Sequence, residues 1–146
     1  MNPPLRSGDD RLAMLEGLRD GTLDYLATDH APHTLEEKAS GVSGQPHLDT
    51  YGAFVTWMIL EAGFSPERIA AVCCENPGTF VNPYTGPRQF GWIAPGYSAS
   101  LTVLNLTRPV TIRNDQLATK CGWSPFEGIT FPGSVEAVVI DGQRVR

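Results

Sequence analysis

The sequence has few cysteines, no long hydrophobic run and no excess of basic residues. Its three cysteines include an adjacent pair, Cys73 and Cys74, but form no CxxC metal pair or even-numbered disulfide framework, so we expect reduced, buried thiols. The longest apolar stretch, residues 51–60, is far shorter than the ~20 residues of a membrane span, so we expect no membrane-spanning helix. Sixteen Asp and Glu outnumber eleven Lys and Arg, and the formal charge of −5 gives nucleic-acid binding no electrostatic support.

What the sequence does contain is typical of one globular domain. Its 146 residues are 41% hydrophobic, enough for a core but too few for a complete large enzyme fold. Fifteen Gly and twelve Pro exceed the usual combined share of roughly 12%, which indicates many ordered loops. The N-terminal residues show no charged segment followed by an apolar one, so we expect a cytoplasmic protein.

The first third of the chain predicts a helix, a strand and a long loop. Ser7 is a suitable N-cap and Gly21 a suitable C-terminal stop for a first helix. Its buried stripe is expected to be formed by Leu12, Leu15 and Leu18. Residues 23–28 are predominantly apolar, as expected for a parallel-type strand buried on both faces. Residues 29–49 then form a loop too long for an ordinary connection, which favours a functional role.

The rest of the chain predicts two helices followed by strands. The first helix spans residues 50–62, and a second begins at Ser65-Pro66 and ends near Asn76-Pro77. Strands are expected at residues 100–106, 110–113 and 135–140, the last entering a hairpin at Asp141-Gly142 that leads to Arg144. The change from helices to strands near Phe90 predicts two parts, residues 1–90 and 91–146.

Residues 27–34 hold the strongest candidate site, because one carboxylate and two imidazoles directly follow the predicted strand. Active sites gather at such carboxyl ends of strands in α/β folds. Asp29 could bind a divalent metal and accept a proton, and His33 could meet an anionic substrate.

Two other interpretations fit the residue types in this segment. One is an exposed turn in which Asp29 is a cap or turn former and the histidines are incidental, since short motifs often match by chance. The other is a small zinc site built from His30, His33 and His47. Its ligand count is suitable, but it lacks the close spacings of a structural zinc site.

The sequence resembles the dihydroorotase family of the amidohydrolase superfamily. The most specific motif is Ala-Thr-Asp-His-Ala-Pro-His-Thr at residues 27–34, since related hydantoinases and allantoinases vary the residues after the Asp-His pair. Further matching segments lie, in order, at residues 2–6, 9–11, 36–38, 44–48, 75–77, 91–96, 124–128 and 138–145. The resemblance therefore extends over essentially the whole chain.

This resemblance implies an α/β fold, namely the C-terminal part of a (β/α)₈ barrel followed by strands of a β-sandwich. It also implies the interconversion of dihydroorotate and N-carbamoyl-L-aspartate, a step of pyrimidine biosynthesis. Asp29 would be both a zinc ligand and the catalytic proton carrier. His33 would bind the substrate carboxylate. The other substrate-binding residues would be Asn2, Gly44, His47 and Leu48, although supporting hydrogen bonds are an alternative role for His30 and His47.

The family's remaining metal ligands have no counterparts in these 146 residues. They are a His-x-His pair, a carboxylated lysine and two further histidines. A hydrolytic metal centre takes at least three protein ligands, so we expect the chain alone to be inactive and to need the N-terminal part of a barrel. An oligomer or a pyrimidine-pathway enzyme could also be a partner. The alternatives are a non-catalytic structural or binding subunit, or another cyclic amidohydrolase such as a hydantoinase or allantoinase.

Overall fold

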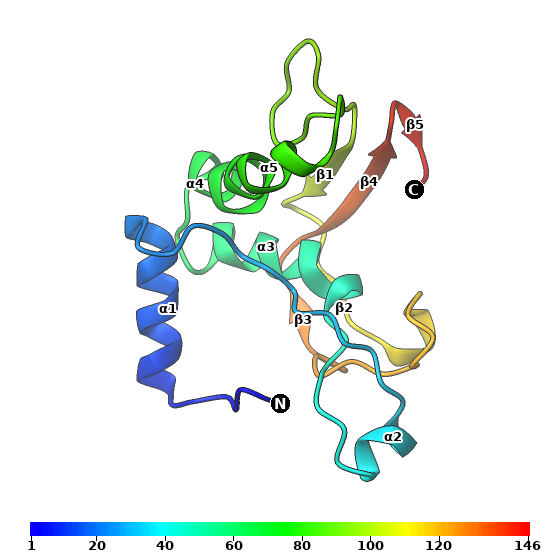
Figure 1. Ribbon diagram of the computed structural model, residues 1–146. Helices are drawn as coiled ribbons and strands as arrows, with labels where there is room; N and C mark the ends of the chain where they lie inside the picture. The colour runs from blue at the N-terminus through cyan, green and yellow to red at the C-terminus, as the bar shows by residue number, and fades with distance from the viewer.

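The computed structural model describes residues 1–146 as a mixture of helices and short strands (Figure 1). The helices are α1 (Gly8–Asp20), α2 (Leu35–Ala39), α3 (Tyr51–Leu60), α4 (Pro66–Ala70) and α5 (Asn76–Val81). The strands are β1 (Leu101–Asn105), β2 (Val110–Thr111), β3 (Thr130–Phe131), β4 (Ser134–Ile140) and β5 (Gln143–Arg144). Single 3₁₀ turns lie at Leu48–Thr50, Asn82–Tyr84 and Asn114–Gln116. None of the helices has the length and hydropathy of a membrane span.

The first helix begins and ends where its capping residues predict. Ser7 accepts from the main-chain N–H of Asp10, whose carboxylate accepts from the N–H of Ser7 in return, and Gly21 ends α1 at a φ of 95°. The predicted stripe is only partly buried. Leu18 is buried and Leu15 packs against the core, but Leu12 is 57% exposed because the N-terminal half of α1 extends beyond the core cluster.

The predicted strand at residues 23–28 is wrong, because this segment is extended but forms no ladder. Its backbone groups bond to helical residues instead. The N–H of Leu26 donates to the carbonyl of Val72 at 3.0 Å, and its carbonyl accepts from the Tyr51 hydroxyl at 3.1 Å. The carbonyl of Asp24 accepts from the Asn76 side chain at 2.6 Å. A strand needs a neighbour that offers backbone groups, and within these residues helices take that place.

Helix α3 lies at the centre of the molecule, as expected for a helix that is apolar nearly all round (Figure 1). One of its sides joins the main core cluster, formed by Leu18, Val55, Met58, Phe64, Ile69 and Val72. Another side contributes Ala53 to a smaller cluster with Ile112 of the β2–β3 region and Phe131. Gly52 allows a close approach to β4, because a Cβ there would collide with the Val135 side chain.

The second helix of this part continues past its predicted end at Asn76-Pro77. Between α4 and α5, residues Ala71–Glu75 form a π-helical turn, and the N–H of Asn76 donates to the carbonyl of Ala71. The wider turn and the position of Pro77 in the first turn of α5 avoid the usual conflict between proline and a continuing helix. The three cysteines are free thiols, but none is fully buried as predicted: Cys73, which packs against the core cluster, and Cys121 are half-buried, and Cys74 is exposed.

The strands form two small antiparallel sheets. β1 pairs with β4, which pairs with β5 across the predicted hairpin, where Asp141 and Gly142 have φ of 50° and 80°. β2 pairs with β3, a two-residue strand that the sequence did not predict. The sheet of β1, β4 and β5 packs against α3 and holds the C-terminus (Figure 1).

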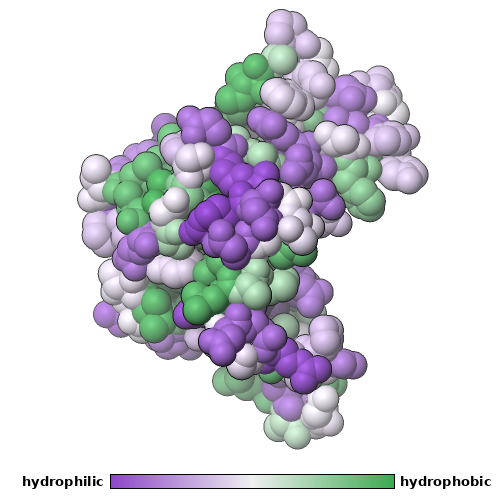
Figure 2. All heavy atoms as spheres, turned by 90° about the vertical axis from the view of Figure 1, so that its left-hand side faces the viewer, coloured by the Kyte–Doolittle hydropathy of each residue, from purple (hydrophilic) through white to green (hydrophobic).

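Many large apolar side chains are exposed at the surface, and only 17 of the 146 residues are buried. Figure 2, which views the α1 side, shows several separate hydrophobic areas among polar ones. Leu12 and Met14 of α1 are more than half exposed, and Ile93 is 89% exposed. Such areas are typical of surfaces that pack against other polypeptide.

Candidate active site

The candidate site starts at Asp29, where the extended segment after α1 turns. Asp29 is exposed and has a φ of 45°, in the left-handed region that non-glycine residues seldom adopt. Asp tolerates this region better than most residues, and backbone strain of this kind is concentrated at functional sites. The turn places the carboxylate at the surface, beside the segment that begins with His30.

Two parts of the long loop are fastened together by His30. The residue forms a parallel bridge with Gln45, and the N–H of Ala31 donates to the Gln45 carbonyl at 3.0 Å. The His30 Nδ1 atom accepts from the main-chain N–H groups of both His47 and Leu48, each at 3.1 Å. Because Nδ1 accepts these two bonds, the ring N–H of His30 is the one at Nε2. This arrangement agrees with the supporting role that the sequence left open for His30.

Gly44 lets the two parts approach each other closely. Its φ is 120°, and a Cβ at this position would lie 2.5 Å from the Ala31 Cβ and 3.2 Å from the His33 Cδ2. Only glycine combines this backbone conformation with this closeness. Gly44 therefore lies beside the His33 imidazole.

His33 lies in a tight turn directly before α2. Its N–H donates to the Ala31 carbonyl at 3.1 Å, and its Nδ1 lies 3.5 Å from the Glu37 carboxylate. The main-chain N–H of Thr34 donates to the same carboxylate and, with smaller help from the charge of His33, lowers the pKa of Glu37. The imidazole is half-buried, so one part of it still faces solvent.

His47 and Leu48 lie on the second segment of the candidate site, where their main-chain N–H groups contact His30. The His47 ring lies 5.9 Å from the Phe126 ring, and burial lowers the pKa of His47. The main chain of Leu48 is held by His30 while its side chain is 62% exposed. Main-chain atoms of this segment are thus fixed near an open surface.

Asn2 is the one predicted site residue that the structure does not bring to the others. It is exposed at the N-terminal end of the chain, ahead of α1 (Figure 1). The remaining predicted residues, Asp29, His33, Gly44, His47 and Leu48, lie on two segments joined by His30.

The sequence did not reveal two residues that connect this site to the C-terminal part of the chain. The Trp123 indole N–H donates to the His33 carbonyl at 2.7 Å. The Asp49 carboxylate accepts from the main-chain N–H groups of Ala118 and Thr119 at 3.2 and 3.0 Å. Both contacts join positions about 70 to 90 residues apart. Contacts at such separations cannot be predicted from a local sequence pattern.

The residues present do not by themselves fit a zinc centre. No three His, Cys, Asp or Glu side chains of residues 1–146 are grouped so as to hold a metal ion. The interpretation of His30, His33 and His47 as a zinc site is therefore wrong, because the structure does not group these side chains around one point. Asp29 offers a single carboxylate, whereas a catalytic zinc needs about three protein ligands.

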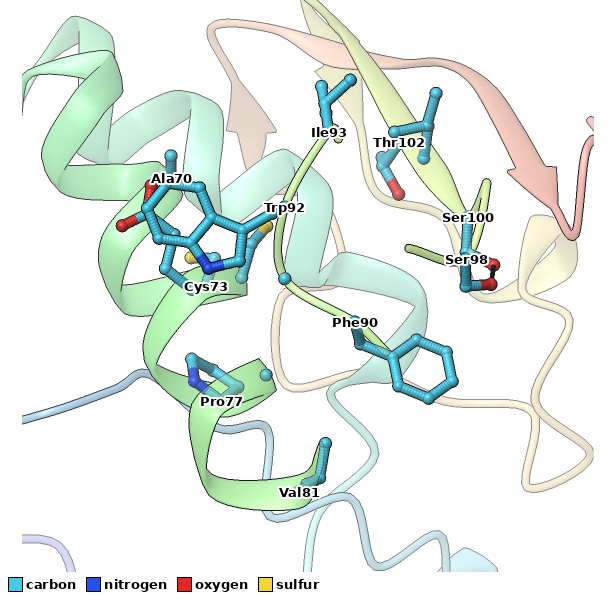
Figure 3. Close-up of a pocket in the computed structure, with 15 residues that line it drawn as sticks. Ala70, Cys73, Pro77, Val81, Phe90, Trp92, Ile93, Ser98, Ser100 and Thr102 are labelled. Atoms are coloured by element: carbon cyan, nitrogen blue, oxygen red, sulfur yellow. Dashed lines mark hydrogen bonds between the residues drawn. The ribbon is translucent and has the colours of Figure 1, made fainter. Parts of the chain in front are cut away.

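An open groove lies elsewhere on the molecule, between the π turn with α5 and residues 90–102 (Figure 3). It has a volume of about 510 Å³, and Trp92, Cys73 and Pro77 line it. Burial raises the pKa of the Cys73 thiol, which keeps it protonated and weakly nucleophilic. The groove contains none of the predicted site residues, so it belongs to a different face.

Known proteins match the chain over nearly its whole length. It is 36% identical to a dihydroorotase of Brevibacillus brevis over 151 residues, which covers 99% of this chain and 34% of the relative. It is 37% identical to a dihydroorotase of Anaplasma phagocytophilum, with coverage of 99% and 32%. The chain thus spans about a third of the length of the curated relatives it matches.

Solved structures agree with the fold. An L-hydantoinase (dihydropyrimidinase) from Arthrobacter aurescens superimposes with a TM-score of 0.87 at 28% identity, covering 98% of this chain and 33% of that one. A D-hydantoinase (dihydropyrimidinase) from Thermus sp. gives the same TM-score at 22% identity, covering 99% and 32%. The model of the Amidohydrolase family matches residues 2–145. The chain therefore belongs to the amidohydrolase family.

Proposed function

We propose that this chain is the part of a dihydroorotase-type cyclic amidohydrolase that carries Asp29 and the substrate-facing segment around Gly44. The observation that supports it best is the juncture at His30, which brings the Asp29–His33 motif and the main chain of residues 44–48 together. Identities of 36 and 37% to dihydroorotases favour dihydroorotate and N-carbamoyl-L-aspartate as the substrate pair.

In the proposed reaction a water oxygen adds to the ring carbonyl carbon of dihydroorotate. The amide C–N bond then breaks, and the nitrogen gains the proton that water has lost. Asp29 is the carrier of that proton, because it offers an exposed carboxylate. The imidazole of His33 binds the substrate carboxylate, and main-chain atoms near Gly44, His47 and Leu48 face the ring. For Asn2, the proposed substrate-binding role is supported only by the resemblance to dihydroorotases.

The zinc of this proposal depends on ligands beyond residues 1–146, since Asp29 is the single metal-binding carboxylate the motif supplies. The proposed architecture is a (β/α)₈ barrel piece at residues 1–90 and β-sandwich strands at residues 91–146. Relatives about three times as long, together with the exposed apolar areas of Figure 2, support packing against further barrel elements. An oligomer or a pyrimidine-pathway enzyme would be a further partner.

Three free cysteines fit a reducing compartment, so we place the proposed enzyme in the cytoplasm. A second candidate is ring opening of another cyclic amide, which the 28% identity and TM-score of 0.87 to an L-hydantoinase favour. A non-catalytic structural or binding subunit is the third candidate.

A chimera tests the proposal. The third of the Brevibacillus brevis dihydroorotase that matches this chain is replaced by residues 1–146, and the unaltered relative is the positive control. We expect the chimera to open dihydroorotate and an Asp29→Asn chimera to be almost inactive. A folded chimera that opens hydantoin but not dihydroorotate supports the second candidate. One that binds zinc and opens neither ring supports the third.

A further inference from the structure

We propose that Trp123 is a positioning residue for the candidate site, because its indole N–H fixes the main chain of His33 and so aims the imidazole. This inference rests on the proposed function, in which His33 binds the substrate carboxylate. It assigns a role to a side chain that lies 90 positions away from His33 in the sequence.

The argument begins with the hydrogen bonds of the His33 peptide groups. His33 precedes Thr34, the N-cap of α2, so its carbonyl takes no part in the helical ladder, whose first acceptor is the Thr34 carbonyl. The N–H of His33 is used by the tight turn to Ala31. The indole of Trp123, at 2.7 Å, is the side-chain donor that satisfies the carbonyl. Both sides of the residue are therefore fixed, which restricts its backbone dihedrals.

Trp123 can act in this way only if its own position is rigid. The next residue, Ser124, is buried, and its N–H donates to the Asn114 side chain at 2.8 Å. The Asn114 N–H in turn donates to the Glu127 carboxylate at 2.5 Å. These bonds close residues 114–127 into a loop with internal support.

A second contact fastens the same loop to the other end of the site segment. Asp49 accepts from two consecutive main-chain N–H groups, those of Ala118 and Thr119. Residues 114–127 thus hold the segment near its start at His33 and near its end at Asp49. The donor to the His33 carbonyl is the Trp123 side chain, so a substitution at Trp123 can remove it without altering the backbone of residues 114–127.

The first experiment uses the 146-residue chain. The three indole N–H signals in a ¹H–¹⁵N correlation spectrum are assigned with Trp57→Phe, Trp92→Phe and Trp123→Phe variants, and the histidine ring signals with His33→Ala. We expect the Trp123 indole proton to exchange with solvent at least about 10-fold more slowly than that of Trp92, which is 51% exposed. We also expect Trp123→Phe, but not Trp92→Phe, to shift the ring signals of His33.

The second experiment uses the active chimera. Trp123→Phe keeps the aromatic bulk and loses only the donor, so we expect KM for dihydroorotate to rise about 3- to 10-fold, the range of one hydrogen bond, with kcat nearly unchanged. Trp92→Phe is the matched control and should change neither constant.

The two experiments separate failure of this inference from failure of the proposed function. An inactive chimera with Trp123 intact overturns the proposed function, and the His33 ring signals of the 146-residue chain still decide whether Trp123 positions them. Rapid exchange of the Trp123 indole, or unshifted His33 signals in Trp123→Phe, overturns the inference. So does a Trp123→Phe chimera with unchanged KM.

Discussion

His30 and His47 are joined by a hydrogen bond in which the main-chain N–H of His47 donates to the His30 Nδ1 atom at 3.1 Å. The same atom accepts from Leu48, so one imidazole orders two consecutive peptide groups. The sequence separation of 17 residues makes this bond the fastening of the long loop that carries the candidate site.

Replacing His30 tests how much this fastening contributes to stability. His30→Ala leaves two N–H groups to water and should lower the free energy of unfolding by about 1–2 kcal/mol. His30→Asn puts an oxygen near the Nδ1 position and should recover part of that loss. Urea denaturation measures both variants. Equal midpoints for the two would contradict the role given to the Nδ1 acceptor.

Gly44 provides a second test, based on space rather than on hydrogen bonding. A methyl group there would press against Ala31 in a conformation that suits glycine, so Gly44→Ala should cost about 2–4 kcal/mol. Gly41→Ala is the matched control, because its φ of 92° is also positive but nothing lies within 4 Å of an added Cβ. It should cost only about 1 kcal/mol. Thermal unfolding distinguishes them, and equal costs would exclude the close approach.

The lowered pKa of His47 predicts a pH dependence of stability. Burial disfavours the charged imidazole in the folded state, so the unfolded chain binds a proton first as the pH falls below its ordinary pKa of 6.5. The contribution of His47 is therefore fully present above about pH 6.5 and is lost as the pH falls through the lower pKa of the folded state.

The measurement compares the wild-type chain with His47→Gln by denaturation between pH 7.5 and about 5, a range that spans the histidine titration. We expect the stability of the wild type to fall more steeply than that of the variant. Parallel curves would mean that His47 titrates alike in the folded and unfolded chains.

Elements with local signals could be predicted from the sequence. Ser7 and Gly21 define both ends of α1, Ser65-Pro66 marks the start of α4, and Asp141-Gly142 forms the hairpin turn. Each depends on side chains within a few residues of the backbone they satisfy. The motif of residues 27–34 was likewise visible in the sequence, but the loop predicted for residues 29–49 contains the short helix α2, which begins at a capping box between Thr34 and Glu37 that the sequence analysis missed.

Features that depend on distant partners could not be predicted. Residues 23–28 have a strand pattern, yet helical residues such as Val72 and Asn76 take their hydrogen bonds. The helix passes Asn76-Pro77 because a π turn before it changes the bonding. The hydrogen bond from Trp123 to His33 could not be predicted either, because an indole N–H can donate to any acceptor that the tertiary fold places near it. The local sequence shows which backbone groups need a hydrogen-bond partner, but the identity of that partner depends on the tertiary structure.

The metal requirement of the proposed function can be tested with the chain itself. After incubation with zinc and dialysis, we expect residues 1–146 to retain far less than one zinc per chain and to show no turnover of dihydroorotate. One carboxylate at Asp29 is too few ligands. The active chimera serves as the zinc-retaining control for elemental analysis. Stoichiometric zinc on the isolated chain would show that these residues do form a metal site.

Substitutions in the chimera separate the roles of Asp29 and His33. Asp29→Asn keeps the shape but removes the proton-accepting oxygen, so kcat should fall about 10²- to 10⁴-fold. His33→Ala removes one contact to a charged substrate group, about 1.5–3 kcal/mol or roughly 10- to 150-fold in kcat/KM. Asp29 should be the costlier loss.

The two losses should also appear in different constants. A contact to the substrate carboxylate that is equally strong in the ground and transition states affects KM, whereas proton transfer affects kcat. Steady-state kinetics, with zinc content checked in each preparation, measures both. Nearly normal kcat in Asp29→Asn would remove Asp29 from the proton-transfer role. Unchanged kcat and KM in His33→Ala would leave His33 as a turn residue whose ring contacts Glu37 and no substrate.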